Sequence, residues 1–325
     1  MLNSNLAELE QLLSAGQIAC PNCHSTFSRD GMAALSSLPC PSCGHTMFVG
    51  IKVGKYYLQQ PVSAEGSQAV HLALAQEDGE LLPVVVKTIA VSSKSHPANI
   101  QALWNEAQVG GLLNDTDYVS GCLDHGVSNG YYYIARPYVE GERLDRFIAS
   151  HGKLAPIDAI RLGTHLLAAI QHIYHVGFLF RNLKPENILL NPYGYAVLFG
   201  LGQCRPVNDA KVPTAFDKPV SPVVYYAPER LLNQGETIAS ELYSLGMVLY
   251  YAATGHAYFT DEEFKDLLSR RFTGTRPVGG RFANLPTSLA ILLDSMLRFN
   301  SAERPHDCPE VDDSLKAILT ELEED

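Results

Sequence analysis

The stretch "FRNLKPENILL" covers residues 180–190 and carries an arginine, a lysine and two asparagines between Arg181 and Asn187. "VVVK" at residues 84–87 comes before it, and "YYAPE" at residues 225–229 comes after it. Each of the three stretches is short, so none of them decides the fold by itself. Their order along one chain carries more weight, because motifs that agree with one another support a single interpretation.

Strand patterns fill the first half of the chain and helix patterns fill the second half. "AVHLALAQ" at residues 69–76 has the alternation of a strand, and "LLPVVVKTI" at residues 81–89 is an apolar strand run. Asn129–Gly130 predicts a hairpin turn. Helices are predicted from Pro97 onward and over 156–175, 238–255, 261–271, 287–299 and 309–324. Strands followed by helices indicate an α+β fold, and we find no internal repeat.

Four cysteines near the N-terminus have the spacing C-x2-C-x16-C-x2-C: Cys20, Cys23, Cys40 and Cys43. Four thiolates on two tight turns can close a tetrahedron around Zn²⁺, and a site filled by four protein ligands is structural. Two disulfides or free thiols are the alternatives. The sequence shows no secretory leader and no apolar run of membrane-spanning length. We therefore expect no membrane contact and a cytoplasmic, reducing setting, which favours the metal.

The segment over residues 17–52 resembles a zinc ribbon, a small unit whose folding energy comes largely from its metal. Zinc ribbons bind proteins, bind nucleic acids or brace a neighbouring domain. The formal net charge of −11 works against a broad contact with nucleic-acid phosphates, so a nucleic-acid partner is disfavoured. No Gly/Ser-rich or Pro-rich linker follows the ribbon, and we expect it to pack on the next domain.

The three stretches and the order of elements resemble the protein kinase superfamily, and its bacterial Ser/Thr branch in particular, over residues 55–320. The resemblance implies a bilobal protein-kinase-like fold preceded by the small four-cysteine zinc ribbon. The small lobe would cover residues 53–140 and the large lobe residues 141–325. A short N-terminal helix is predicted over residues 1–16.

The resemblance also implies a nucleotide pocket at four positions of this chain. Lys87 matches the strand lysine that contacts phosphates, and Glu106 matches its helix partner. Lys184 matches the lysine that steadies the transferred phosphate, and Asn187 matches a metal-binding asparagine. For Lys87 and Glu106 the alternative is that both are ordinary surface charges.

Other matches have a scaffold role. Arg181 matches the arginine before the catalytic residue, and Glu241 takes the place of an aspartate that supports the same loop. Glu229 and Arg304 match a buried ion pair of the large lobe, whose loss should destabilise the fold.

The catalytic positions depart from the family pattern. Asn182 stands where the family has its catalytic aspartate, and a carboxamide does not take up a proton near neutral pH. The magnesium-binding DFG motif is replaced by Gly200, Leu201 and Gly202, and residues 192–203 contain no Asp or Glu. The metal that neutralises charge on the transferred phosphate would therefore lack a ligand.

The nucleotide-binding side departs as well. Ser63, Glu65 and Gln68 occupy positions where the family has glycines that let the backbone approach the phosphates. Arg136 falls at the gatekeeper position beside the adenine pocket. A guanidinium buried there needs a partner, so we predict that Arg136 pairs with Glu106 and fills nucleotide space. The alternative is a strand register shifted by one residue, with Arg136 facing solvent.

Three functions follow from these observations. The first is a pseudokinase that binds a protein partner, such as an active kinase or its substrate, with structural zinc and doubtful binding of ATP and Mg²⁺. The second is an atypical Ser/Thr protein kinase or nucleotidyl transferase that uses ATP, because Lys87, Glu106, Lys184 and Asn187 are kept. The third is a zinc-ribbon nucleic-acid binder, which the net acidity disfavours.

Overall fold

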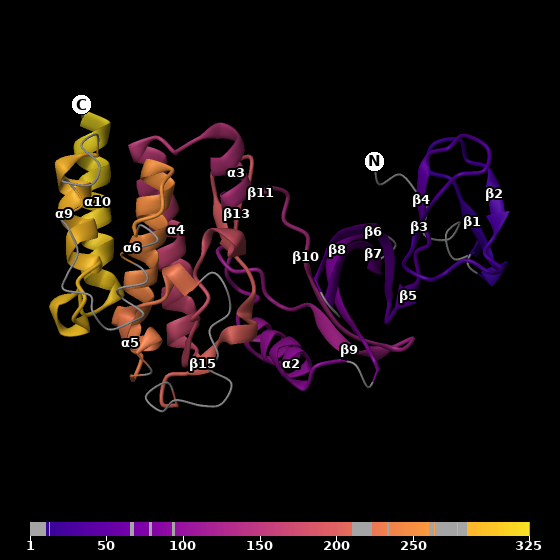
Figure 1. Cartoon of the computed structure of the whole chain (residues 1–325), viewed down its shortest axis with the longest axis horizontal. Coiled ribbons are helices and arrows are strands. Elements are labelled where there is room, and N and C mark those ends of the chain that lie inside the picture. The colour runs from indigo at the N-terminus through magenta and orange to yellow at the C-terminus, as the bar shows by residue number, and fades with distance from the viewer. Residues whose placement is uncertain are drawn as a thin grey trace. The chain divides into compact units, whose positions relative to one another are not determined.

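The computed structural model describes the greater part of the chain (Figure 1). The described residues are 11–12, 14–65, 68–77, 80–92, 95–209, 223–232, 234–259, 263, 278 and 285–324. The predicted helix over residues 1–16 lies mostly outside them. The chain divides into two compact units, Met1–Ala107 with Cys122–Tyr138, and Gln108–Gly121 with Val139–Asp325. The predicted domain boundaries stay predictions.

The N-terminal part of the first unit consists of two short antiparallel hairpins. Their strands are β1 (Gln17–Ala19) with β2 (Thr26–Ser28), and β3 (Ser37–Pro39) with β4 (Thr46–Phe48). Every strand of the second hairpin, and both of its cysteines, lies 20 positions after its counterpart in the first. The segment is therefore an internal repeat, and our interpretation of the sequence as free of repeats was wrong. Only the "CP-x-C" turn and one threonine are shared between the two copies, which is too little to stand out.

The rest of the first unit is a six-stranded antiparallel sheet with one helix. The strand order is β5-β6-β7-β8-β10-β9. The bounds are β5 (Lys52–Val53), β6 (Tyr56–Glu65), β7 (Gln68–Glu77), β8 (Glu80–Ala90), β9 (Asp124–Ser128), β10 (Tyr131–Pro137) and α2 (Pro97–Gly111). The predicted hairpin turn is confirmed, since Asn129 and Gly130 have positive φ angles of 49° and 79°, as a two-residue turn requires.

The two faces of this sheet have different neighbours. Successive side chains of a strand point to opposite faces, and paired residues of adjacent strands share a face. Lys87 pairs with Ile134, and Val85 pairs with Arg136, on the face that packs against α2, here called the front face. The opposite face, called the back face, carries a buried cluster that includes Val86. The members of that cluster are Ile51, Val53, Tyr56, Leu58, Ala73, Ala75, Val84, Val86, Tyr133 and Ala135.

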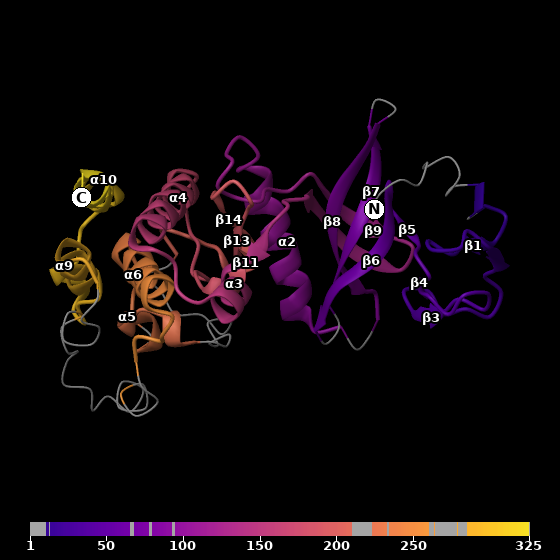
Figure 2. The same cartoon turned by 90° about the horizontal axis from the view of Figure 1, so that it is seen from above.

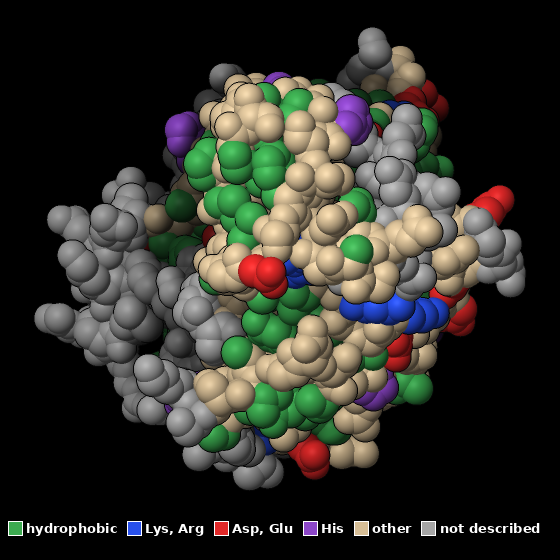
Figure 3. All heavy atoms as spheres, turned by 90° about the vertical axis from the view of Figure 1, so that its right-hand side faces the viewer, with side chains coloured by type: hydrophobic (Ala, Val, Ile, Leu, Met, Phe, Trp, Pro, Cys, Tyr) green, Lys and Arg blue, Asp and Glu red, His purple; other side chains and the backbone are tan. Residues whose placement is uncertain are grey.

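The ribbon packs on the back face, as predicted from the absence of a linker. Leu35 and Phe48 of the ribbon lie against the back-face cluster. The chain then passes straight from β4 into β5 and the sheet (Figure 2). Residues 17–52 contain three formally charged side chains, Arg29, Asp30 and Lys52. Among the described atoms in view in Figure 3, green apolar and tan uncharged atoms cover most of the surface.

The second unit is mainly helical. Its helices are α3 (Leu144–His151), α4 (Pro156–His175), α5 (Pro228–Leu231), α6 (Ile238–Thr254), α9 (Thr287–Met296) and α10 (Cys308–Glu324). A three-stranded sheet consists of β11 (Glu142–Arg143), β13 (Ile188–Leu190) and β14 (Ala196–Leu198), and β12 (Phe178–Leu179) pairs with β15 (Arg205–Pro206). Four of the predicted helices are confirmed as α4, α6, α9 and α10. The helix predicted over residues 261–271 falls almost wholly outside the described residues.

Helix α6 forms the centre of this unit. It is buried along nearly its whole length, because most of its residues are apolar and its buried Ser240 and Glu241 have hydrogen-bond partners. Thr237 and Ser240 cap its start reciprocally, and Gly255 ends it in the left-handed conformation that favours glycine. Helices α4, α6, α9 and α10 lie side by side around one apolar core (Figures 1 and 2).

Candidate functional site

The four predicted cysteine ligands come together at the tips of the two ribbon hairpins. Their Sγ atoms all lie within 4.8 Å of one another. The distance is 3.6 Å between Cys20 and Cys43, and 3.7 Å between Cys23 and Cys40. A tetrahedral zinc with bonds of about 2.3 Å requires sulfur atoms about 3.8 Å apart. The donor set and its spacing therefore fit one zinc ion, and the cluster could hold a metal.

Hydrogen bonds around the cluster favour the thiolate form of two ligands. The side chain and the backbone N–H of Ser25 lower the pKa of Cys23 to about 6. The backbone N–H of His45 and the side chain of Asn22 lower the pKa of Cys43. Burial acts in the opposite direction on Cys40 and raises its pKa to about 11. Donors of this kind orient metal ligands and make thiolates available for a cation.

Three charged side chains meet on the front face of the sheet. Lys87 Nζ lies 3.0 Å from Glu106 Oε2, and Arg136 Nη1 lies 3.4 Å from Glu106 Oε1. The Glu106 side chain is 2% exposed and that of Arg136 is 10% exposed. Burial alone would raise the pKa of Glu106, but the two cations hold it below its ordinary value. The pair between Arg136 and Glu106 that we predicted is present, and Arg136 does not face solvent.

The position that matches the family's glycine-rich loop lies on strands β6 and β7. Ser63 pairs with Val70 and Glu65 pairs with Gln68, and the register shifts between Pro61 and Ser63. The backbone at Ser63, Glu65 and Gln68 belongs to the ladder between two ten-residue strands. These three residues stand where the resemblance implies glycines.

In the second unit, Asn182 is hydrogen-bonded to the segment of Gly200, Leu201 and Gly202. Its Nδ2 donates to the carbonyl of Gly200 at 3.2 Å. The Nδ2 of Asn187 donates to the carbonyl of Asn182 at 2.8 Å. An amide can make the first bond, whereas an ionised aspartate cannot, because it has no proton to donate. Asn182 therefore acts here as a structural link between two loops.

The backbone conformation at position 200 explains why glycine stands there. Gly200 has a φ of +87°, and a Cβ built on it would lie 3.2 Å from Asn187 Oδ1. Any larger residue would be strained and crowded at this position. Leu201 is buried in the core of the unit, and Lys184 is half-buried beside the short 3-10 turn Pro185–Asn187. The first carboxylate after Asn187 in the sequence is Asp209.

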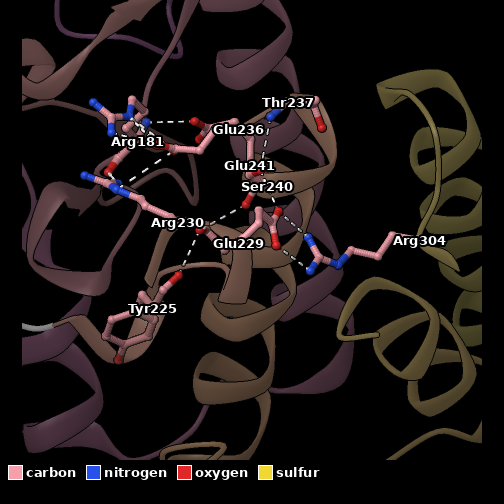
Figure 4. A network of polar contacts seen from close by, with 10 residues as sticks. Arg181, Tyr225, Glu229, Arg230, Glu236, Thr237, Ser240, Glu241 and Arg304 are labelled. Atoms are coloured by element: carbon pink, nitrogen blue, oxygen red, sulfur yellow. Dashed lines mark hydrogen bonds and ion pairs between the residues drawn. The ribbon is translucent and has the colours of Figure 1, made fainter. Parts of the chain in front are cut away.

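A buried network of polar contacts holds Arg181, the residue before Asn182 (Figure 4). Glu236 binds the guanidinium of Arg181 through both of its oxygens, at distances of 2.6 to 3.1 Å. The N–H of Arg181 donates to Glu241 Oε1 at 2.8 Å, and its carbonyl accepts from Arg230. Arg181 has a φ of +65°, so these contacts hold a strained backbone in place. Our sequence analysis missed both Glu236 and Arg230.

The second part of the network is the predicted pair of Glu229 and Arg304 (Figure 4). The two side chains form two parallel hydrogen bonds of 2.8 Å. Ser240 donates to Glu229 at 2.6 Å, and the Arg304 guanidinium lies 4.7 Å from the ring centroid of Tyr243. The Arg304 side chain is fully buried. This part of the site is scaffold, since nothing in it faces solvent.

The raised pKa of Glu241 predicts that the stability of the fold depends on pH. Burial raises its pKa from 4.5 to about 7, Glu236 adds to this, and the Arg181 N–H and Arg230 oppose it. Its Oε2 has no hydrogen bond among the described residues. A raised pKa means that the folded state holds the proton more tightly, so this contribution to stability is full below pH 4.5 and is lost as pH rises through about 7.

We therefore expect Glu241→Gln to match the native chain in stability near pH 5 and to become relatively more stable by pH 8. Urea unfolding at both pH values measures the difference. A difference between the two proteins that does not change with pH would contradict the assignment. Glu303→Gln changes an exposed carboxylate of the same unit and serves as the control.

Comparison with known proteins agrees with this geometry. Residues 65–314 match the protein kinase domain family. The serine/threonine-protein kinase PknK of Mycobacterium tuberculosis is 29% identical over 223 residues, which is 68% of this chain and 20% of that protein. PrkC of Bacillus subtilis, another serine/threonine-protein kinase, is 26% identical over 266 residues, 79% of this chain and 40% of PrkC.

The serine/threonine-protein kinase PknH of Mycobacterium bovis is 26% identical over 259 residues, 80% of this chain and 42% of PknH. The chain thus spans less than half the length of these relatives. Within the described ranges, none of the helices combines the length and the apolar character needed to cross a membrane.

Proposed function

The chain belongs to the protein kinase family, and we propose that within it this protein is a pseudokinase, which keeps the fold and acts by binding a protein partner. The observation that carries the proposal is the bond between Asn182 and the carbonyl of Gly200. The bond makes Asn182 a hydrogen-bond donor at the position that matches the family's catalytic base, and it joins Asn182 to a segment without an acidic metal ligand. General-base help is worth about 10²–10⁴ in rate, and charge neutralisation by the metal is a further main part of phosphoryl transfer.

Arg136 supports the proposal from the small-lobe side. It lies beside Lys87 on the front face and shares the carboxylate of Glu106 with it. The family uses that carboxylate to position the phosphate-binding lysine. A second cation on the same carboxylate weakens the hold on Lys87, and we propose that the Arg136 side chain occupies space that a nucleotide would need.

Removal of the arginine tests this step. We expect Arg136→Ala to bind ATP with a Kd of about 1 mM or lower, equivalent to about 4 kcal/mol, where the native chain shows no binding. Lys87 still neutralises Glu106 in this variant, so the fold should persist. Isothermal titration with ATP measures the gain. Arg161→Ala, which removes an arginine that is half exposed, is the matched control and should leave binding undetectable. A folded Arg136→Ala protein without ATP binding would contradict the role of Arg136.

A phosphotransfer assay tests the pseudokinase itself. The native chain is incubated with labelled ATP and Mg²⁺ or Mn²⁺, alone and with a generic protein substrate, beside Lys87→Ala. We expect the native chain and Lys87→Ala to carry the same amount of label. Label above that of Lys87→Ala would favour the second candidate, an atypical protein kinase or nucleotidyl transferase. Labels on the α- and γ-phosphates would distinguish these two chemistries.

The low charge of the ribbon bears on the kind of partner. With Arg29, Asp30 and Lys52 as the only formal charges in residues 17–52, the ribbon has no basic face for phosphates. Arg29 also donates to the carbonyl of Gly50 at 2.7 Å, within the ribbon's own fold. We therefore propose a protein partner, a cytoplasmic location and a structural zinc. Retention on DNA or RNA that weakens steeply with salt would instead favour a nucleic-acid binder.

A further inference from the structure

The ribbon packs on the back face of the sheet, whereas Lys87 on β8 and Arg136 on β10 lie on its front face. Phe48 of the ribbon lies against His71 of β7, with ring centroids 5.7 Å apart. His71 is 2% exposed and pairs across the ladder with Val86 of β8. Val86 immediately precedes Lys87, whose side chain points to the front face. A single strand residue thus separates the surface covered by the ribbon from the lysine of the cluster.

Hydrogen bonds join the end of the ribbon to the sheet at a second place. The backbone N–H of Leu58 donates to the carbonyl of Ile51 at 2.9 Å, and the side-chain Nδ2 of Asn129 donates to the carbonyl of Lys52 at 3.3 Å. Gly50 approaches the sheet so closely that a Cβ built on it would lie 2.1 Å from the carbonyl oxygen of Leu58. Close contact of this kind resists small displacements, because packed interfaces do not deform continuously.

The ribbon itself has little to hold it without a metal. Its buried cluster consists of Ile18, Cys20, Cys40, Met47 and Val49, and two of these five are the proposed ligands. Because its core is so small, such a unit takes most of its folding free energy from metal binding. Loss of the metal should therefore release Leu35 and Phe48 from the back face.

We propose that the metal in the four-cysteine site controls the small-lobe sheet, so that its loss loosens β8 and β10 and with them the cluster of Lys87, Glu106 and Arg136. In this proposal the metal-loaded ribbon stabilises, by packing against it, the sheet that carries this cluster. The inference rests on the proposed function only in treating that cluster as the altered nucleotide pocket. Its own readouts involve neither nucleotide nor phosphate transfer, so either proposal can fail alone.

The chain carries its own reporter for this coupling. Trp104 is the single tryptophan. It lies on α2 against the front face, with its ring centroid 5.9 Å from that of Tyr132 on β10 and 5.7 Å from that of His125 on β9. A change at the back of β10 that reaches the front should alter the fluorescence of Trp104.

The experiment removes the metal from the full zinc-loaded chain with a chelator and follows Trp104 fluorescence and amide hydrogen exchange. We expect exchange in residues 84–90 and 131–137 to become at least about tenfold faster, since exchange reports local opening, together with a change in fluorescence. Metal release is measured in parallel. Unchanged exchange in both strands after complete release of the metal would overturn the proposal.

Two matched variants test whether the effect of metal loss reaches the sheet through the contact between Phe48 and His71. Phe48→Ala keeps all four cysteines but removes the ring from His71, whereas Phe27→Ala removes a ring that packs against the ribbon's own buried cluster. With metal binding verified for both, chelation should affect β8 and β10 several-fold less in Phe48→Ala than in Phe27→Ala. Equal responses would overturn the proposed route. Leu35→Ala, at the other contact with the back face, replaces Phe48→Ala if that variant fails to bind metal.

Discussion

Replacement of Arg304 by alanine is expected to lower the free energy of unfolding by about 3–5 kcal/mol, because it leaves a buried carboxylate without its cation. Among the described residues, the Glu229 carboxylate would keep the hydroxyl of Ser240 as a hydrogen-bond donor. Three backbone carbonyls, those of Arg298, Ala239 and Phe299, would also lose the hydrogen bonds that Arg304 donates. The cation over the ring of Tyr243 is lost at the same time. Urea unfolding followed by circular dichroism measures the loss.

An exposed ion pair of the same unit gives the control. Lys316 and Asp312 form a helical pair with side chains 63% and 31% exposed. Lys316→Ala should therefore change stability by less than about 0.5 kcal/mol. The double variant Glu229→Leu/Arg304→Met should be more stable than Arg304→Ala, since neither buried charge is then left alone. An Arg304→Ala protein as stable as Lys316→Ala would show that the pair does not hold this unit together.

Glu106→Gln is expected to have an effect of similar size in the first unit, about 3–5 kcal/mol, because two cations would then share a buried site without an anion. Lys87 and Arg136 both lie within 3.4 Å of the Glu106 carboxylate. Their attraction outweighs the burial of Glu106 and lowers its pKa. Trp104 is on the same helix, so its fluorescence follows the unfolding of this unit directly.

The Glu106 prediction has an exposed counterpart and a rescue. Glu77→Gln breaks the pair with Lys55, in which both side chains are 51% exposed, and should change stability by less than about 0.5 kcal/mol. Adding Arg136→Leu to Glu106→Gln removes one of the two stranded cations and should restore part of the loss. A Glu106→Gln protein that unfolds like Glu77→Gln would contradict the account of the cluster.

Local patterns allowed much of the fold to be predicted. Pro156 begins α4, because the fixed φ of proline suits the first turn of a helix. Helix α6 is buried because most of its residues are apolar. Both signals act within one segment of the chain. The family match agrees with the α+β fold inferred from the motif order. The cysteine spacing predicted the cluster, since two turns with the same spacing bring four sulfur atoms to one point.

The missed contacts involve residues far apart in the chain. Nothing near Glu236 in the sequence indicates that it binds Arg181, which lies 55 positions earlier. The bond from Asn182 to Gly200 depends on a left-handed turn at Gly200 that the resemblance did not indicate. Arg136 shows the intermediate case, because a shift of one residue in β10 would have turned it to the other face. Sequence predicted the pair, but the register decided between the two alternatives.

The most direct test of the central claim is a thermal melt of the zinc-loaded chain with saturating ATP, in the presence and absence of Mg²⁺. A ligand that binds only the folded state raises the melting midpoint, by an amount that corresponds to about 2.7 kcal/mol at 100 times its Kd. Because no acidic residue lies between Asn187 and Asp209, we expect no increase that depends on Mg²⁺. A midpoint that rises with ATP and Mg²⁺ together, but not with either alone, would contradict the account and indicate a working metal-nucleotide site.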